Sequence, residues 1–168
     1  MQTETFFYPI GLNLEDIKCL VIGGGNVATR KVLKLIEYKA KSITVISLDL
    51  TSILDECHKQ NQIKWINREY KKTDIRGEKI IFAATDNDEL NCEIGKSAKK
   101  NHLLVNVVSS PEHGNFILPA IYRKKHLCIA TFTDGYSPKF AQFIRDEIAN
   151  HLQENITIQL QDGKSKNN

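Results

Sequence analysis

The fold of this chain is decided by one stretch: Lys18-Cys19-Leu20-Val21-Ile22-Gly23-Gly24-Gly25-Asn26-Val27-Ala28-Thr29-Arg30-Lys31. An apolar run ends in three glycines, and a helical pattern begins directly after them. If these segments are a strand, a tight turn and a helix, Gly23, Gly25 and Ala28 fit the G-x-G-x-x-A pattern of dinucleotide-binding proteins. The turn would come from Gly23, a pyrophosphate would approach the backbone at Gly25, and the helix would pack on the strand at Ala28. Because the start of a helix favours anions, we expect a dinucleotide there; the alternative is a tight turn that binds nothing.

The composition limits the class of protein. The 168 residues suit one domain, or one domain with an appendage, and 41% hydrophobic residues are enough to build a core. A net charge of +3 is too small to suggest nucleic acid as a partner, but it suits an acidic small molecule. No apolar run is long enough to cross a membrane, and residues 1–5 lack the basic and apolar parts of a signal peptide.

The spacing of the cysteines and histidines indicates neither a metal site nor a disulfide bond. The four cysteines are scattered without a C-x-x-C motif, so we expect free thiols in a reducing cytoplasm. The histidines show no ligand spacing, and no metal site is predicted.

Strands and helices alternate along the first two thirds of the chain. This order predicts a doubly wound, mostly parallel α/β sheet, with an apolar N-terminal segment at 6–10 running beside or under it. A polar connection is expected at 67–77. The expected strands are 18–22, 42–46, 63–66, 79–84 and 103–108, and the expected helices are 26–38, 51–60 and 89–100.

Ligands of such sheets bind beyond the carboxyl ends of the strands. One rim would therefore hold the glycines, Ser47, the pair Thr85-Asp86 and residues 106–109. Dinucleotide folds often place an acid at the end of the second strand to hold a ribose, but this chain has Ser47 there and Asp49 two residues later. The choice between NAD and NADP is therefore undetermined.

The pattern changes after Pro111. An apolar segment at 116–122 is broken by proline, a strand is expected at 127–133, and Ser137-Pro138 fits the start of a helix. These elements are too few for a core of their own, which favours an interface with a second subunit. We therefore expect a dinucleotide domain at 1–112, a small α+β dimerisation and substrate module at 113–161, and a disordered tail at 162–168.

Several stretches carry a family resemblance. They are Tyr8-Pro9; Val21-Ile22-Gly23-Gly24-Gly25-x-Val27-Ala28-x-Arg30-Lys31; Ala83-Ala84-Thr85-Asp86-x-x-x-Leu90-Asn91; Val105-Asn106-Val107-Val108; Phe116-Ile117-x-Pro119-Ala120; and Gly135-x-Ser137-Pro138 with Ala141 and Ile144-Arg145. They follow one another over residues 8–150, and the chain resembles the precorrin-2 dehydrogenases, the NAD-dependent module of siroheme synthesis that also occurs fused in siroheme synthases. The resemblance implies a Rossmann domain, a dimerisation module and a homodimer. It also implies oxidation of precorrin-2 to sirohydrochlorin with reduction of NAD, and in some relatives insertion of ferrous iron.

Two departures from the family pattern stand out. The family commonly has an aspartate directly after the Asn-Val-Val stretch, where this chain has Ser109, and serine is a poor general base without a partner. Glu112 and His113 lie close by in sequence and could stand in. Relatives also usually continue into a further helical region, whereas this chain stops soon after the helix expected at 138–152.

The candidate site residues follow from the rim and from the resemblance, and each has a simpler structural alternative. Thr85 and Asp86 could only cap the helix at 89, Asn106 could be a satisfied polar group, and His113 could be merely exposed. The basic run at 123–125 could be a solvated turn, and Ser137 could be a helix cap. The cofactor-binding candidates are Gly23, Gly24, Gly25, Asn26, Val27, Ala28, Ser47, Thr85 and Asp86; the catalytic candidates are Asn106, Ser109 and His113; the substrate-binding candidates are Arg123, Lys124, Thr133 and Ser137.

The resulting interpretation is a cytoplasmic, homodimeric, NAD-dependent precorrin-2 dehydrogenase. Ferrochelatase activity is a further possibility that Ser109 puts in question. The alternative is a dinucleotide- or tetrapyrrole-binding sensor or carrier that kept the fold and lost the chemistry.

Overall fold

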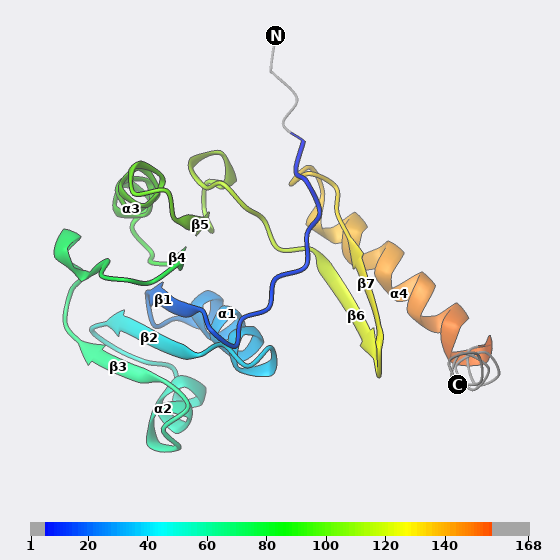
Figure 1. Ribbon diagram of the computed structural model, residues 1–168, viewed down its shortest axis with the longest axis horizontal. Coiled ribbons are helices and arrows are strands. Elements are labelled where there is room, and N and C mark those ends of the chain that lie inside the picture. The colour runs from blue at the N-terminus through cyan, green and yellow to red at the C-terminus, as the bar shows by residue number, and fades with distance from the viewer. Residues whose placement is uncertain (1–5, 156–168) are drawn as a thin grey trace, which may run out of the picture. The chain divides into compact units, whose positions relative to one another are not determined.

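The computed structural model describes residues 6–155 (Figure 1), and their side chains as far as residue 152. The chain divides into two compact units: Tyr8–Phe116 is one, and the other joins the residues from 117 onward to the segment that ends at Phe7. The division falls four residues after the boundary expected at 112, because residues 115 and 116 remain bonded to the sheet: Asn115 N donates to Val105 O at 2.9 Å, and Asn106 Nδ2 donates to Phe116 O at 3.1 Å. The tail expected at 162–168 and the end of the second module, 156–161, lie outside the described residues.

A five-stranded parallel sheet forms the larger unit. Its spatial order is β3-β2-β1-β4-β5, and every neighbouring pair is parallel. The predicted doubly wound α/β fold is therefore confirmed, with strand ends within two residues of the expected ones. The strands are β1 (Lys18–Ile22), β2 (Ser42–Ser47), β3 (Lys64–Asn67), β4 (Ile80–Ala83) and β5 (Leu104–Val107).

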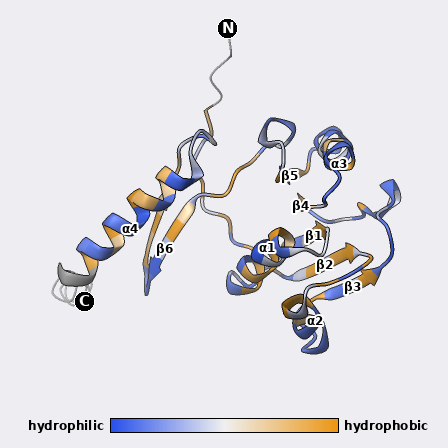
Figure 2. Cartoon of the chain, turned by 180° about the vertical axis from the view of Figure 1, so that it is seen from behind, coloured by the Kyte–Doolittle hydropathy of each residue, from blue (hydrophilic) through white to orange (hydrophobic). Residues whose placement is uncertain are grey.

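Helices cover both faces of this sheet. Helices α1 (Asn26–Glu37) and α2 (Ser52–Lys59) pack on one face, where they meet Cys19 and Val21 of β1. The other face of β1, with Leu20 and Ile22, belongs to the core beneath α3 (Asp88–Lys100). Successive strand residues point to opposite faces, so a strand buried on both sides is apolar throughout. In β1 the four residues after Lys18 are buried and apolar, and Figure 2 shows the hydrophobic colouring of this strand; β2 also carries Ser42, Thr44 and Ser47.

The connection from β3 to β4, expected as a polar segment, contains a short 3-10 helix, Lys72–Asp74. Asp74 holds this connection together. Its carboxylate accepts hydrogen bonds from Arg68 Nη1 and Nη2 at 2.8 and 2.7 Å, and from the Lys71 N–H at 2.7 Å. The Arg68 guanidinium, followed by the Lys71 N–H, lowers the pKa of the Asp74 carboxyl.

The smaller unit is a β-hairpin with a helix. Strands β6 (Ala120–Lys124) and β7 (Leu127–Thr131) are antiparallel, and α4 spans Pro138–Asn155. The prediction missed β6 because Pro119 and the basic run looked like a break and a turn. Pro119 instead precedes the strand, where a missing N–H is tolerated, and only Lys125 has the positive φ of a turn, 52°.

The N-terminal segment is not part of the sheet. Phe6, Tyr8 and Ile10 have no strand assignment and are 77%, 87% and 60% exposed, so of the two expected placements, beside or under the sheet, the second is wrong. Within the smaller unit, the Phe7 N–H donates to Asp134 Oδ1 at 3.1 Å. Among the helices described between residues 6 and 155, none has both the length and the hydropathy needed to cross a bilayer.

We expect Asp74→Asn to lower the free energy of unfolding at pH 7 by about 1 kcal/mol, a value discounted for the solvent exposure of the pair. Because folding lowers the pKa of this carboxyl, its stabilisation is present above the unfolded pKa of about 4 and is lost as the pH falls through the folded value. Denaturant unfolding at pH 7 and at pH 2 measures the difference between the two proteins. Glu69→Gln is the control, and equal losses in both variants would contradict the role of Asp74.

Candidate functional site

The three glycines differ in the space around them. At Gly23 φ is +117°, and a Cβ would collide with the Ala84 carbonyl of β4's end. A Cβ on Gly24 would collide with the Asp49 carbonyl and approach Ser47 Oγ to 2.6 Å. By contrast, a Cβ on Gly25 would meet no atom within 4 Å. The first two glycines thus let the backbone pass between strand ends, and the third leaves open space beside the start of α1.

The N-terminus of α1 has no side-chain cap. Gly25 is its N-cap residue, and its first turn holds no acid. Thr29, one turn on, donates its hydroxyl to Gly25 O at 3.0 Å and contacts Thr51 Oγ1 at 2.8 Å, which braces α1 against the start of α2. Uncapped N–H groups, the helix dipole and an unobstructed glycine suit a pyrophosphate, so the residues present fit a dinucleotide. The predicted residues Asn26 and Val27 form this first turn, and Ala28 is fully buried against the sheet.

A lysine on α1 adds positive charge near the sheet. Lys31 is half-buried, and its Nζ lies 5.8 Å from the centre of the Phe82 ring. Burial, and after it the charge of Arg30, lowers the pKa of Lys31.

Ser47 ends β2 beside the glycines, as predicted. Its hydroxyl and its carbonyl oxygen both accept from Trp65 Nε1, each at 3.2 Å. No acid stands at this strand end, and what Asp49 supplies next to Gly24 is its backbone carbonyl. The Trp65–Ser47 and Thr29–Thr51 contacts join residues 18 and 22 positions apart, so no local sequence pattern predicts them.

Beyond β4, Asn91 organises the rim. This side chain is fully buried on α3 and bonds both Thr85 and Ser109. Asn91 was not among the predicted site residues, although it lies three residues before the inward-facing Ile94, and that spacing indicates a buried position. The suggested cap of α3 by Thr85 or Asp86 is wrong: the N-cap is Asn87, whose Oδ1 accepts from the Leu90 N–H at 2.9 Å.

The predicted catalytic candidates follow one another along β5 and the turn after it. Asn106 is 6% exposed, and its Oδ1 has no hydrogen-bond partner among the described residues, so the alternative of a satisfied polar group holds only for its amide nitrogen. Ser109 is exposed. His113 ends a short 3-10 helix, Pro111–His113, with Nε2 3.9 Å from Glu112 Oε1.

The predicted substrate-binding residues lie in the smaller unit. Arg123 and Lys124 belong to β6, so the alternative of a solvated turn is wrong for these two residues. Thr133 Oγ1 accepts from the Ser137 N–H at 3.0 Å, and Ser137 Oγ accepts from the Phe140 N–H at 3.2 Å. The alternative role of Ser137 as a helix cap is thereby confirmed. In the part of the chain that the structure describes, no three His, Cys, Asp or Glu side chains are grouped to hold a metal ion.

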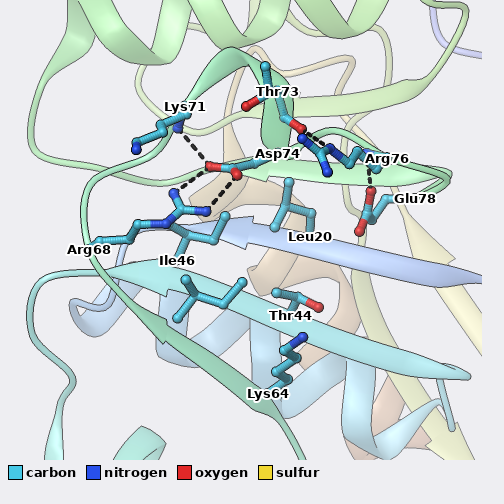
Figure 3. Close-up of a pocket in the computed structure, with 11 residues that line it drawn as sticks. Leu20, Thr44, Ile46, Lys64, Arg68, Lys71, Thr73, Asp74, Arg76 and Glu78 are labelled. Carbon is cyan, nitrogen blue, oxygen red and sulfur yellow. Dashed lines mark hydrogen bonds and ion pairs between the residues drawn. The ribbon is translucent and has the colours of Figure 1, made fainter.

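A hollow of about 360 Å³ lies on the face of the sheet opposite α1, beneath the β3–β4 connection (Figure 3). Its fully buried base includes Leu20 and Ile46, and four cations and two acids surround it. None of the predicted site residues lines it. The charged residues are Lys64, Arg68, Lys71, Asp74, Arg76 and Glu78.

Comparisons with known proteins also indicate a dinucleotide-binding domain. A family model described as putative NAD(P)-binding matches residues 10–120. The siroheme synthase of Methylococcus capsulatus is 34% identical over 142 residues, which are 84% of this chain and 30% of that protein. The precorrin-2 dehydrogenase of Bacillus subtilis is 34% identical over 140 residues, 83% of this chain and 85% of that protein. The solved structure of SirC, a precorrin-2 dehydrogenase, superposes with a TM-score of 0.76 at 29% identity and covers 86% of this chain and 71% of its own.

The sheet order and the glycine loop define a Rossmann-type NAD(P)-binding domain. More narrowly, the chain belongs to the precorrin-2 dehydrogenase family. It spans about 30% of the length of the siroheme synthases that it matches.

Two neighbouring glycine variants separate folding from binding. Gly24→Ala places a methyl group against the Asp49 carbonyl, so we expect it to lower the free energy of unfolding by about 2–3 kcal/mol. Gly25→Ala has extended backbone angles and open space, so it should fold normally while raising the Kd for NADH about tenfold, or about 1.4 kcal/mol. Thermal unfolding and NADH fluorescence measure the two effects. A Gly25→Ala protein that binds NADH as tightly as the parent would contradict the assignment.

Proposed function

We propose that this chain oxidises precorrin-2 to sirohydrochlorin with NAD as hydride acceptor. The observation that carries the proposal is the unobstructed Gly25 at the bare start of α1, in a chain 34% identical to a precorrin-2 dehydrogenase over 85% of that protein's length. When bound, the nicotinamide takes up the hydride that leaves the substrate.

The residues of this chain bind the dinucleotide and orient its nicotinamide. The N–H groups of the first turn of α1 would hold the pyrophosphate, and Ser47 would lie toward the ribose of the cofactor. Thr85 and Asp86 lie at the nicotinamide end of the same rim, with Asn106 on the neighbouring strand. The unpartnered Asn106 Oδ1 can accept a hydrogen bond from a ligand, which would satisfy a buried polar atom.

The reaction also releases a proton, and we assign its acceptance to His113. A serine at position 109 is a poor base, whereas the imidazole stands four residues further along, beside Glu112. In the smaller unit, the cations Arg123 and Lys124, with Thr133 and Ser137, are proposed to meet the carboxylates of the tetrapyrrole.

An anaerobic assay tests the proposal. Protein, precorrin-2 and NAD should yield NADH absorbance and the sirohydrochlorin spectrum in equal amounts, and NADP in place of NAD shows which nucleotide is used. Adding ferrous iron to the product reports ferrochelatase activity separately. Binding of both ligands without turnover would overturn the proposal.

Ser109 also motivates a second candidate, a sensor or carrier without chemistry. Ser109→Asp restores the residue that the family commonly carries. If the chain is an enzyme, the parent protein turns over and the variant changes kcat less than tenfold. An inactive parent with an active variant would favour the sensor.

We further propose a homodimer built on the smaller unit. The rings of Phe140 and Phe143 stack with centroids 6.4 Å apart and are 54% and 55% exposed, while Ala141 and Ala149 are the only buried apolar residues of α4 as far as residue 152. Such an apolar face suits a second copy of the chain. The double variant Phe140→Ser/Phe143→Ser should be monomeric by light scattering. The control Ile53→Ser, at a 51% exposed position on α2, should stay dimeric, and a dimeric double variant would exclude this face.

We also propose that the enzyme acts in the cytoplasm. All four cysteines are free thiols, and burial raises the pKa of Cys19 to about 11. Persistent free thiols are typical of a reducing compartment.

A further inference from the structure

The buried amide of Asn91 joins the ends of β4 and β5. Its Oδ1 accepts from the Thr85 N–H at 3.1 Å and from the Thr85 hydroxyl at 2.8 Å. Its Nδ2 donates to the Thr85 carbonyl at 3.0 Å and faces Ser109 Oγ at 3.4 Å. Asn91 therefore ties the turn after β4 to the position where the family commonly has an aspartate.

The orientation of this amide is fixed by its partners. A backbone N–H can only donate and a backbone carbonyl can only accept, so the two backbone groups of Thr85 allow one placement of oxygen and nitrogen. The atom that faces Ser109 is therefore the amide nitrogen. At 3.4 Å this bond is long, but the second N–H of Asn91 has no other acceptor among the described contacts.

The hydrogen bond from Asn91 Nδ2 determines whether the Ser109 hydroxyl can donate to a ligand or accept from one. With Asn91 Nδ2 directed at a lone pair of Oγ, the hydroxyl proton points away from Asn91, and the exposed side of Ser109 faces solvent. A hydroxyl held in this way donates, and among the described residues no acceptor lies behind it to take its proton.

We infer that Asn91 is a positioning residue that holds Ser109 as an outward-facing hydrogen-bond donor, and that Ser109 uses this donor to bind a carboxylate of the substrate. The identity of the substrate rests on the proposed function; the Asn91–Ser109 contact does not. Ser109 then contributes to substrate binding, in contrast to the proton acceptance that an aspartate would supply at the same position.

A thiol reports the contact without any turnover. In Ser109→Cys, a donor at Asn91 stabilises the thiolate, so iodoacetamide should alkylate this cysteine at pH 7 at least threefold faster than the native Cys128, which is also exposed. Peptide mass spectrometry separates it from the native cysteines. Equal rates at the two positions would overturn the inference, and this comparison keeps Asn91 intact.

Two further variants test the amide itself. Asn91→Asp keeps the acceptor for the Thr85 N–H and hydroxyl but removes the donors to the Thr85 carbonyl and to Ser109, and it should slow alkylation of the 109 thiol about tenfold. Asn91→Leu should slow it as well, without an added charge. The control Asn115→Asp makes the same chemical change in an amide that bridges Val105 N and Leu103 O, and it should leave the rate unchanged. A rate insensitive to Asn91, or one that falls equally in the control, would contradict the inference.

Kinetics then assign the role of Ser109. Ser109→Ala should raise KM for precorrin-2 about tenfold with kcat lowered less than threefold, and Asn91→Asp should add little in that background. A large loss of kcat at unchanged KM would show that Ser109 takes part in proton transfer. A positive thiol result with no turnover in the parent would leave the contact intact and refute the proposed function alone.

Discussion

The backbone between β1 and α1 passes so close to its neighbours that no side chain fits at two consecutive positions. Gly23 lies against the carbonyl of Ala84, and Gly24 lies against that of Asp49. The Gly23 N–H also donates to Ile46 O, and the Thr51 N–H donates to Gly24 O, each within 3.0 Å. This constraint brings the ends of β1, β2 and β4 to one place and leaves Gly25 and the start of α1 open to a ligand.

A second polar junction completes the same rim. Asn91 is buried without charge, and its amide satisfies the backbone of Thr85 while it reaches Ser109. Nearby, Asn106 uses its nitrogen to hold Phe116 and leaves its oxygen unpartnered. A buried amide is costly unless it is bonded: Asn91 meets this requirement within the described residues, whereas the Asn106 oxygen can meet it only by accepting a bond from a ligand or from water.

The sequence predicts the elements whose signals are local. The glycine pattern, the apolar strands and the Thr51 and Ser137 caps are all encoded within a few neighbouring residues, and each lies where it was expected. β6 was missed because Pro119 and a run of cations hide its alternation, and it is defined instead by pairing with β7. The role of Asn91 was missed because its partners lie 6 and 18 residues away, and only the fold brings them together. The N-cap of α3 was wrongly predicted because Thr85, Asp86 and Asn87 are consecutive residues of types that cap helices. The hydrogen bond from the Leu90 N–H identifies Asn87 as the cap.

The central claim is that a dinucleotide pyrophosphate binds at Gly25 and the first turn of α1. Backbone amide resonances in a nitrogen-15 NMR titration with NAD test it residue by residue. The account predicts large, saturable shifts at Gly25, Asn26 and Val27, with those of β7 unchanged. If NAD saturates the protein without shifting these three resonances, and instead shifts those beside the hollow, around Arg68 and Arg76, pyrophosphate binding at Gly25 is contradicted.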